Sequence, residues 1–414
     1  MTERLIAQPL QIARGPALKN RIAKSALSEA LGSIDNRVTP ELIRLYQRWA
    51  SSGAGLLMTG NVMIDRRALG EPGNVVVEDE RDLLRLQQWA AAATSQGTRL
   101  WMQINHPGKQ APRGMNRENV APSAIGFGEK LAPFFPVPRA LKESEIEDII
   151  ERFGNAAAIA QKAGFNGVQL HGAHGYLISQ FLSPHHNRRE DAWGGTAVKR
   201  RRFVTQLYRE VRRRVGEEFP IGIKLNSADF QRGGFTETES LGVIRALAKA
   251  GIDLIEISGG TYEEPAMQGL RKASTASREA YFLEFAEKVR KEVDVPLMVT
   301  GGFRTLAGME APLRANALDL IGLGRILAVE PDAPARLLRG EETRQRVQPL
   351  STGFKYLDGM GSLEVTWYTR QLHRMGRGEA PVPDENPLKS FVLDLRDKGV
   401  GIFRTRRLRA NVQA

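Results

Sequence analysis

The sequence predicts an α/β protein built as a (β/α)₈ barrel, the TIM-barrel architecture, with a C-terminal extension. Eight short apolar runs alternate with longer amphipathic segments between residues 1 and 347. Such alternation is typical of parallel strands joined by helices, and eight strands close a barrel of this kind. No glycine-rich dinucleotide fingerprint follows the first run, which counts against the alternative, a doubly wound open sheet. We therefore predict a barrel domain over residues 1–347 and an extension over residues 348–414.

The apolar runs have the length of strands, and the segments between them have the apolar spacing of helices. The predicted strands are Arg21–Lys24, Gly55–Thr59, Leu100–Ile104, Gly167–His171, Ile221–Leu225, Asp253–Ser258, Leu297–Thr300 and Leu318–Gly322. The predicted helices are Thr39–Ser52, Arg81–Thr94, Ser144–Ala163, Lys199–Val215, Glu237–Ala250, Ser277–Val293 and Thr305–Ala315. The first helix has a clear start signal, because Thr39 can cap it and Pro40 suits its first turn.

Two segments depart from this alternation. Asn105–Ala140 is rich in proline and glycine, and we expect a long loop at the active-site end of the barrel. In the extension, Gly361–Met375 has the pattern of one more amphipathic helix, and a proline-containing connector and a basic tail follow it. We expect the extension to pack on the barrel or on a partner subunit, so a homo-oligomer stays open.

The composition is that of an ordinary soluble globular protein, with 42% hydrophobic and 26% charged residues. No long uncharged apolar run is present, and the N-terminus has no apolar signal segment, so we expect a cytoplasmic protein without a membrane span. Cysteine is absent. This excludes disulfides, thiolate metal sites, iron–sulfur clusters and a cysteine nucleophile.

The formal net charge is +12, from 59 lysines and arginines against 47 acidic residues. Such a charge can indicate a non-enzymatic protein that binds nucleic acid or a membrane surface, or a cavity that collects phosphates. The basic runs Lys199–Arg202, Arg212–Arg214 and Arg404–Arg409 are short and lack interleaved aromatic residues. Solvated helix faces and a basic tail account for them, so we expect a small-molecule substrate and no specific nucleic-acid partner.

The fourth predicted strand ends in a group of polar side chains, His171, His174 and Tyr176. The carboxyl ends of the strands form the functional face of a TIM barrel. Two imidazoles there can donate hydrogen bonds to one carbonyl or anionic oxygen, and the phenol can give a proton. The alternative is a metal pair, but no third protein ligand is evident and we predict no metal.

The seventh and eighth strands end in glycine-bearing turns that contain Gly301, Gly302 and Gly324, and Arg325 follows directly. Backbone N–H groups of such turns can approach a phosphate, and a barrel's phosphate site commonly lies after these two strands. The alternative is that the glycines only make tight turns. Their pairing beside Arg325 favours a phosphate site.

Lys224, on the fifth strand, has two interpretations that the residues alone leave open. Its ammonium can neutralise the negative charge of a bound cofactor, or it can form a buried ion pair with Glu256 on the next strand.

The segment from His171 to Gly195, HGAHGYLISQFLSPHHNRREDAWGG, resembles the signature segment of the old yellow enzyme family of FMN-dependent NAD(P)H oxidoreductases. The resemblance extends from about Leu5 to Arg339. Further matching segments are Leu18–Ile22, Gln103 with His106–Lys109, Thr300–Gly302 and Leu323–Arg325. Zero cysteines exclude the arrangement of members that carry an iron–sulfur domain.

The resemblance implies roles for individual residues. The positions that would contact FMN are Ser25, Ala26, Leu27, Ser28, Gly60, Gln103, Lys224, Gly301, Gly302, Gly324 and Arg325. His171 and His174 would bind the carbonyl oxygen of the substrate, and Tyr176 would be the proton donor. Lys224 stands where Arg is often found, and Ala26 where Pro is common. Ala30 stands where some members have a substrate-contacting Tyr, which predicts a more open substrate pocket.

The activity implied by the resemblance is reduction of the C=C bond of α,β-unsaturated carbonyl compounds at the expense of NAD(P)H. Hydride would pass from flavin N5 to the β-carbon and a proton from Tyr176 to the α-carbon. The alternative on the same barrel is a flavoprotein NAD(P)H oxidase or demethylase-like enzyme. Neither the physiological substrate nor the choice between NADH and NADPH follows from the sequence.

Overall fold

Eight parallel strands form a closed barrel in the computed structural model, which describes residues 4–264, 282–345 and 362–393 with short stretches at 280, 350–353 and 396. The barrel strands are β1 (Ile22–Lys24), β2 (Leu56–Met58), β5 (Arg99–Asn105), β8 (Gly167–Gly172), β9 (Ile221–Asn226), β10 (Leu254–Ser258), β11 (Leu297–Thr300) and β12 (Leu320–Leu323). Each pairs in parallel with its neighbours, and pairings β1–β12 and β2–β5 complete the ring. The predicted (β/α)₈ barrel is confirmed.

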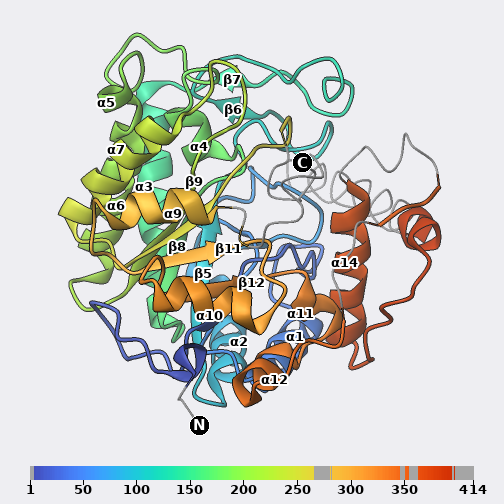
Figure 1. Cartoon of the computed structure of the whole chain (residues 1–414). Helices are drawn as coiled ribbons and strands as arrows, with labels where there is room; N and C mark the ends of the chain where they lie inside the picture. The colour runs from blue at the N-terminus through green and yellow to red at the C-terminus, as the bar shows by residue number, and fades with distance from the viewer. Residues whose placement is uncertain are drawn as a thin grey trace.

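Helices surround these strands (Figure 1) and match the predicted segments closely. Their bounds are α1 (Pro40–Ala50), α2 (Leu83–Thr94), α3 (Glu143–Lys162), α4 (Leu177–Leu182), α5 (Ala197–Arg200), α6 (Arg202–Val215), α7 (Glu237–Ala250), α9 (Leu283–Arg290), α10 (Leu306–Arg314), α11 (Ile326–Val329), α12 (Ala333–Arg339) and α14 (Ser362–Gly376), with 3₁₀ turns η1 (Leu5–Ala7) and η2 (Glu80–Asp82). The Thr39 side chain accepts a hydrogen bond from the Leu42 N–H, as the start signal predicts. Residues 277–279 and 281 of one predicted helix lie outside the described residues. No helix among the described residues is long and apolar enough to cross a membrane.

The long segment after β5 is mostly loop, with one small pair of strands, β6 (Val120–Ala121) and β7 (Arg139–Ala140). Two further short strands, β3 (Val62–Met63) and β4 (Val75–Val76), extend the barrel sheet beside β5. Figure 1 shows the loop that contains β6 and β7 above the barrel, at the end where the strands finish.

The amino-terminal end of the barrel is sealed by apolar side chains. Leu10, Ile12 and Leu18 pack with buried residues of the strands, among them Trp101. A Cβ atom on Gly167 or Gly222 would lie within 2.6 Å or 2.8 Å of the Trp101 ring, so glycine at these two strand positions makes room for the indole. Since this end is filled, space for a ligand within the described part of the chain is expected at the opposite end.

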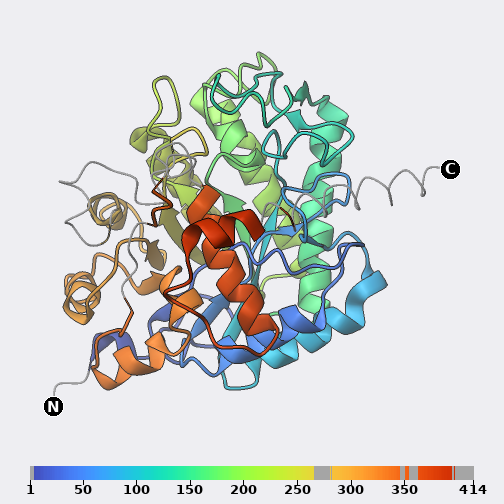
Figure 2. The same ribbon diagram turned by 90° about the vertical axis from the view of Figure 1, so that its right-hand side faces the viewer.

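The extension contributes helix α14, which lies along α1 and α11 on one side of the barrel (Figure 2). The Thr369 hydroxyl donates to the Ser28 carbonyl at 3.1 Å, and His373 Nε2 lies 2.8 Å from the Glu29 carbonyl. Both acceptors belong to the segment directly after β1. The helix predicted at Gly361–Met375 is present as α14. It is hydrogen-bonded to the segment after β1, which contains the predicted site residues Ser25–Ser28.

Candidate active site

A cavity of about 310 Å³ opens at the carboxyl ends of the strands. Every predicted site residue except Gly60 lines it: Ser25, Ala26, Leu27, Ser28, Gln103, His171, His174, Tyr176, Lys224, Gly301, Gly302, Gly324 and Arg325. Gly60 lies behind this surface, where its N–H donates to the Glu29 carboxylate at 2.8 Å. No residue of the loop 105–140 lines the cavity, and Ala30 does not line it either. The prediction that Ala30 opens the substrate pocket therefore has no counterpart in the lining.

His171 and His174 lie side by side at the end of β8, with ring centroids 5.2 Å apart. His171 Nδ1 accepts the Ala173 N–H at 3.3 Å, so the neutral ring carries its proton on Nε2. His174 Nε2 lies 2.7 Å from the Ser258 hydroxyl. Burial, reinforced by the nearby Lys224 charge, holds the pKa of both imidazoles well below the usual value. Both rings are consequently neutral at neutral pH, and each carries one N–H; that of His174 can point to a ligand when the Ser258 hydroxyl donates to Nε2.

Tyr176 completes this end of the cavity, with its ring centroid 4.7 Å from that of His171. Its hydroxyl lies 2.9 Å from the Tyr262 hydroxyl and accepts a hydrogen bond from the Asn61 amide at 3.4 Å. Burial raises the pKa of Tyr176 well above its ordinary value, and the negative charge of Glu71 adds to the effect. The phenol therefore stays protonated at neutral pH until it transfers its proton to a strong base.

Lys224 both lines the cavity and pairs with Glu256, so the two interpretations left open by the sequence are not exclusive. Its Nζ lies 2.9 Å from Glu256 Oε1, on a residue directly opposite in strand register. Glu256 is fully buried and also accepts hydrogen bonds from Gln169 and Thr300, each at 2.7 Å. Since every oxygen of the carboxylate has a partner, the buried ion pair is fully satisfied.

This buried network continues in both directions under the cavity. Gln103 donates to Gln169 at 2.7 Å, and the Ser25 hydroxyl lies 2.7 Å from that of Thr300. The network joins five barrel strands and the segment after β1, and it supplies the amide, hydroxyl and ammonium groups at the base of the cavity. Such a set can hydrogen-bond a flat heteroaromatic ring with carbonyl and N–H groups.

The opposite end of the cavity has the features of an anion site. Gly301 and Gly302 have φ values of 110° and 88°, a backbone conformation that favours glycine, and both line the cavity. Arg304 and Arg325 line the same end, and Gly324 has no atom closer than 3.6 Å to the position of a Cβ. Exposed backbone N–H groups beside guanidinium groups fit a phosphate. Together with the amide and ammonium base, the residues present fit FMN.

Several lining residues were not predicted. They are Asn61, Glu71, Ser258, Tyr262, Thr300, Phe303, Arg304, Gly322, Leu323 and Ile326, with Glu364, Val365, Tyr368, Thr369 and Leu372 from α14. Tyr262 follows β10 by four residues, so the rule that strand ends carry function could have found it. Glu71 hydrogen-bonds the Ser28 hydroxyl. The α14 residues had no such signal.

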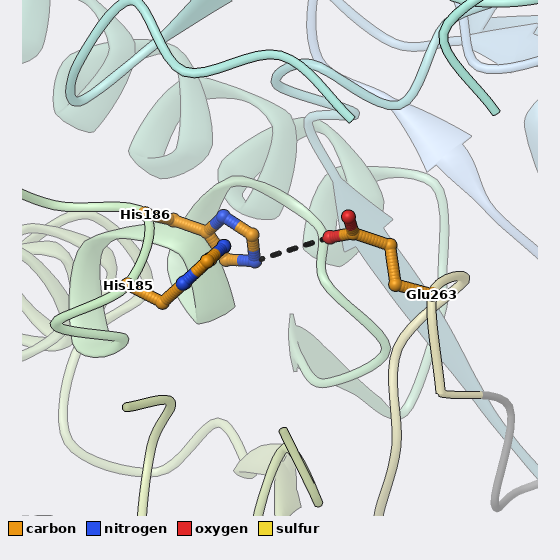
Figure 3. A group of neighbouring side chains, drawn as sticks. All are labelled: His185, His186 and Glu263. Carbon is orange, nitrogen blue, oxygen red and sulfur yellow. Dashed lines mark ion pairs between the residues drawn. The ribbon is translucent and has the colours of Figure 1, made fainter. Parts of the chain in front are cut away.

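A second polar group lies outside the cavity, where the ligand atoms of His185, His186 and Glu263 fall within 4.8 Å of one another (Figure 3). Lys109 Nζ lies 3.2 Å from His186 Nδ1 and 3.7 Å from the Glu263 carboxylate. Because the ammonium donates to Nδ1, the neutral ring carries its proton on Nε2, the nitrogen that faces Glu263 at 3.8 Å. This nitrogen has no lone pair for a metal. An ammonium–carboxylate pair bridged by imidazole accounts for the group.

A TIM barrel with a glycine-lined anion site at one end of its cavity and neutral imidazole and phenol donors at the other defines a flavin-dependent oxidoreductase. The model of the NADH:flavin oxidoreductase / NADH oxidase family matches residues 6–344. The chain belongs to this family, the old yellow enzyme family, whose members use FMN and NADH.

Relatives of known name agree with this assignment. The chain is 34% identical over 397 residues to the NADH-dependent flavin oxidoreductase iliE of Hypocrea jecorina, covering 90% of this chain and 96% of that protein. It is 35% identical over 372 residues to the NADH-dependent flavin oxidoreductase iccE of Talaromyces variabilis, covering 83% and 89%. The protein is thus a flavin oxidoreductase.

Solved structures show the same fold. A 2-naphthoyl-CoA reductase bound to 2-naphthoyl-CoA superposes with a TM-score of 0.75 at 25% identity, over 81% of this chain and 52% of that one. The old yellow enzyme homologue of Zymomonas mobilis gives a TM-score of 0.69 at 24% identity, over 83% and 94%.

Proposed function

We propose that the protein is an ene-reductase that uses FMN and NAD(P)H to reduce the C=C bond of α,β-unsaturated carbonyl compounds. The observation that carries this proposal is the convergence of two neutral imidazoles and a protonated phenol on one wall of the cavity. A carbonyl oxygen that gains negative charge needs such donors, and the carbon atom beside it needs a proton. FMN supplies the hydride chemistry when bound.

His171 and His174 bind and orient the carbonyl oxygen in this proposal. His171 Nε2–H is the donor whose tautomer the Ala173 N–H fixes. A neutral imidazole N–H forms a stronger hydrogen bond with an oxyanion than with the carbonyl oxygen of the ground state. These hydrogen bonds therefore strengthen as negative charge develops on the oxygen. Two contacts keep His174 in position. Its backbone N–H donates to the Asn226 side-chain oxygen at 3.1 Å, and its ring nitrogen Nε2 contacts the Ser258 hydroxyl.

Tyr176 holds the proton at its hydroxyl oxygen and delivers it to the α-carbon. Tyr176 itself is only 7% exposed, whereas Tyr262, whose hydroxyl is 2.9 Å away, is 38% exposed. Burial raises the pKa of Tyr262 to about 12, so its hydroxyl also stays protonated, and in this proposal Tyr262 returns the proton to Tyr176 after each turnover.

The residues that would hold FMN divide by chemistry. Gln103, Lys224 and the backbone around Ser25–Ser28 would contact the ring system, with Lys224 placing a positive charge beside it. Gly301, Gly302, Gly324 and Arg325 would hold the phosphate.

The test is an anaerobic half-reaction. Purified protein loaded with FMN is reduced by NADH, then mixed with cyclohexenone or with oxygen in separate stopped-flow experiments. We expect the enone to reoxidise the flavin rapidly. If oxygen reoxidises it and a panel of enones does not, the protein is an NADH oxidase on the same barrel and the ene-reductase proposal fails.

A further inference from the structure

Helix α14 presents one continuous face to the cavity. Glu364, Val365, Tyr368, Thr369 and Leu372 all line it, and residues at spacings of four and eight lie on one side of a helix. Residues on other sides of the helix, such as Trp367 and Met375, are buried against the barrel. The helix is thus a wall of the cavity, although it lies beyond the region 6–344 that the family model matches.

Glu364 is the lining residue of this wall that carries charge, and it forms an ion pair with Arg325 Nη1. The Arg325 guanidinium also lies 5.9 Å from the centroid of the Tyr368 ring. Two residues one helical turn apart therefore hold the same guanidinium. Arg325 immediately precedes α11 and lies two residues after the end of β12, so its backbone is held by the barrel while its guanidinium pairs with α14.

We propose that Glu364 is a positioning residue that aims Arg325 at the phosphate of the bound cofactor; this inference rests on the FMN site proposed above. A guanidinium has five N–H donors, and the pair with Glu364 through Nη1 does not use all of them. An arginine side chain left unheld samples many rotamers, and fixing one of them before the ligand arrives lowers the entropy lost on binding.

Glu364 also adds a negative charge near the anion site, which acts in the opposite direction. The charge is compensated, because the carboxylate already pairs with Arg325, and Arg304 lines the same end of the cavity. We expect the orientation of Arg325 to outweigh the residual repulsion. The sign of the effect of Glu364 on phosphate binding is what the experiment measures.

The test compares FMN with riboflavin, which has the same ring and ribityl chain but no phosphate. Apoprotein of the full chain is titrated with each flavin, and dissociation constants are obtained from quenching of flavin fluorescence. The variants are Glu364→Gln and, as a matched control, Glu379→Gln, which removes an exposed carboxylate just beyond α14 that pairs with Arg374 of that helix and with Arg377. Circular dichroism and melting temperature establish that each variant is folded.

We expect Glu364→Gln to weaken FMN binding about tenfold, the lower end of the range for one charge-assisted hydrogen bond because Glu364 acts through Arg325, and to leave riboflavin binding unchanged. The double variant Glu364→Gln with Arg325→Met should bind FMN no more weakly than Arg325→Met alone. Unchanged or tighter FMN binding by Glu364→Gln overturns the inference, and so does equal weakening of both flavins, which indicates a merely structural role. If the unaltered protein fails to bind FMN, the proposed cofactor site itself fails and the inference falls with it.

Discussion

The two ends of the cavity are built on different physical principles. At the imidazole end, His171 and Tyr176 are 4% and 7% exposed and uncharged, and short contacts to nearby backbone and side chains hold them. At the anion end, the Arg325 side chain is 28% exposed and charged, and a helix from the far part of the chain holds it. Under the proposed function, the donors that stabilise a developing charge are fixed within the barrel wall, whereas the cation that binds a permanent charge is held by a helix outside that wall.

The largest expected effect lies at the imidazole end. Tyr176→Phe removes the proposed proton donor, and we expect enone reduction to slow by on the order of 10²–10⁴-fold while flavin reduction by NADH is largely kept. Stopped-flow measurement of the two half-reactions checks this. Tyr262→Phe, which removes the proposed partner that returns the proton, should slow enone reduction less than Tyr176→Phe. Equal losses in both half-reactions would contradict the division of roles.

A smaller effect is expected for ligand binding at the same end. His171→Ala removes one N–H donor, so the affinity for a phenolate-type ligand such as p-hydroxybenzaldehyde should fall by about 10–100-fold, the value of a hydrogen bond to a charged group. Titration monitored by the long-wavelength absorption of the flavin complex gives the affinity. Arg325→Met should leave this affinity unchanged in flavin-loaded protein; if it falls there as well, the two ends are not independent.

The neutral state of the buried imidazoles predicts how stability depends on pH. Burial lowers the pKa of His106 to about 4 and those of His171 and His186 well below their usual value. The unfolded chain therefore binds more protons below pH 6.5, and the free energy of unfolding should fall from pH 6.5 towards 4. The slope is up to about 1.4 kcal/mol per pH unit for each such histidine.

Urea titrations at pH 7, 6 and 5 measure that slope. The variant His106→Asn serves as the matched comparison. It should lower the slope by the contribution of one histidine, up to about 1.4 kcal/mol per pH unit. A free energy of unfolding that stays flat between pH 6.5 and 5 would mean that the rings are protonated in the folded protein, and the assignment of neutral donors would be wrong.

The smallest effect concerns salt. Since the anion end binds by charge at a partly exposed guanidinium, raising the ionic strength from about 0.05 M to 0.5 M should weaken FMN binding by a few-fold through screening. Ligand binding at the buried imidazole end should change little over the same range. Equal sensitivity at both ends, measured by flavin fluorescence and absorption titrations, would remove the contrast between them.

The barrel and most of its site could be predicted because both depend on local patterns. Strand–helix alternation fixes the order of elements, and a TIM barrel brings all strand ends to one face, so His171, Lys224 and Gly301 had to meet. The same rule applied after β10 would have included Tyr262. The pairing of Lys224 with Glu256 was one of two open interpretations, and side-chain length in a closed barrel allows both at once.

The role of the extension could not be predicted, for a physical reason. The apolar pattern of α14 indicates that one face is buried, but it does not say against which partner. Thr369 and His373 contact two backbone carbonyl groups of the segment after β1. Backbone carbonyl groups occur along the whole chain, so the sequence does not indicate which of them these side chains contact. Only the assembled barrel distinguishes these carbonyls from the rest.

The bonds from Thr369 to Ser28 and from His373 to Glu29 join positions 341 and 344 residues apart in the chain. During synthesis the eight strands leave the ribosome before residues 362–376, so a barrel can close while one side of its cavity is still missing. If α14 helps to hold FMN as proposed, retention of the cofactor depends on completion of translation. A product terminated prematurely after α12 would retain all eight strands and the glycine turns, yet it would lack both the α14 wall and the carboxylate that pairs with Arg325.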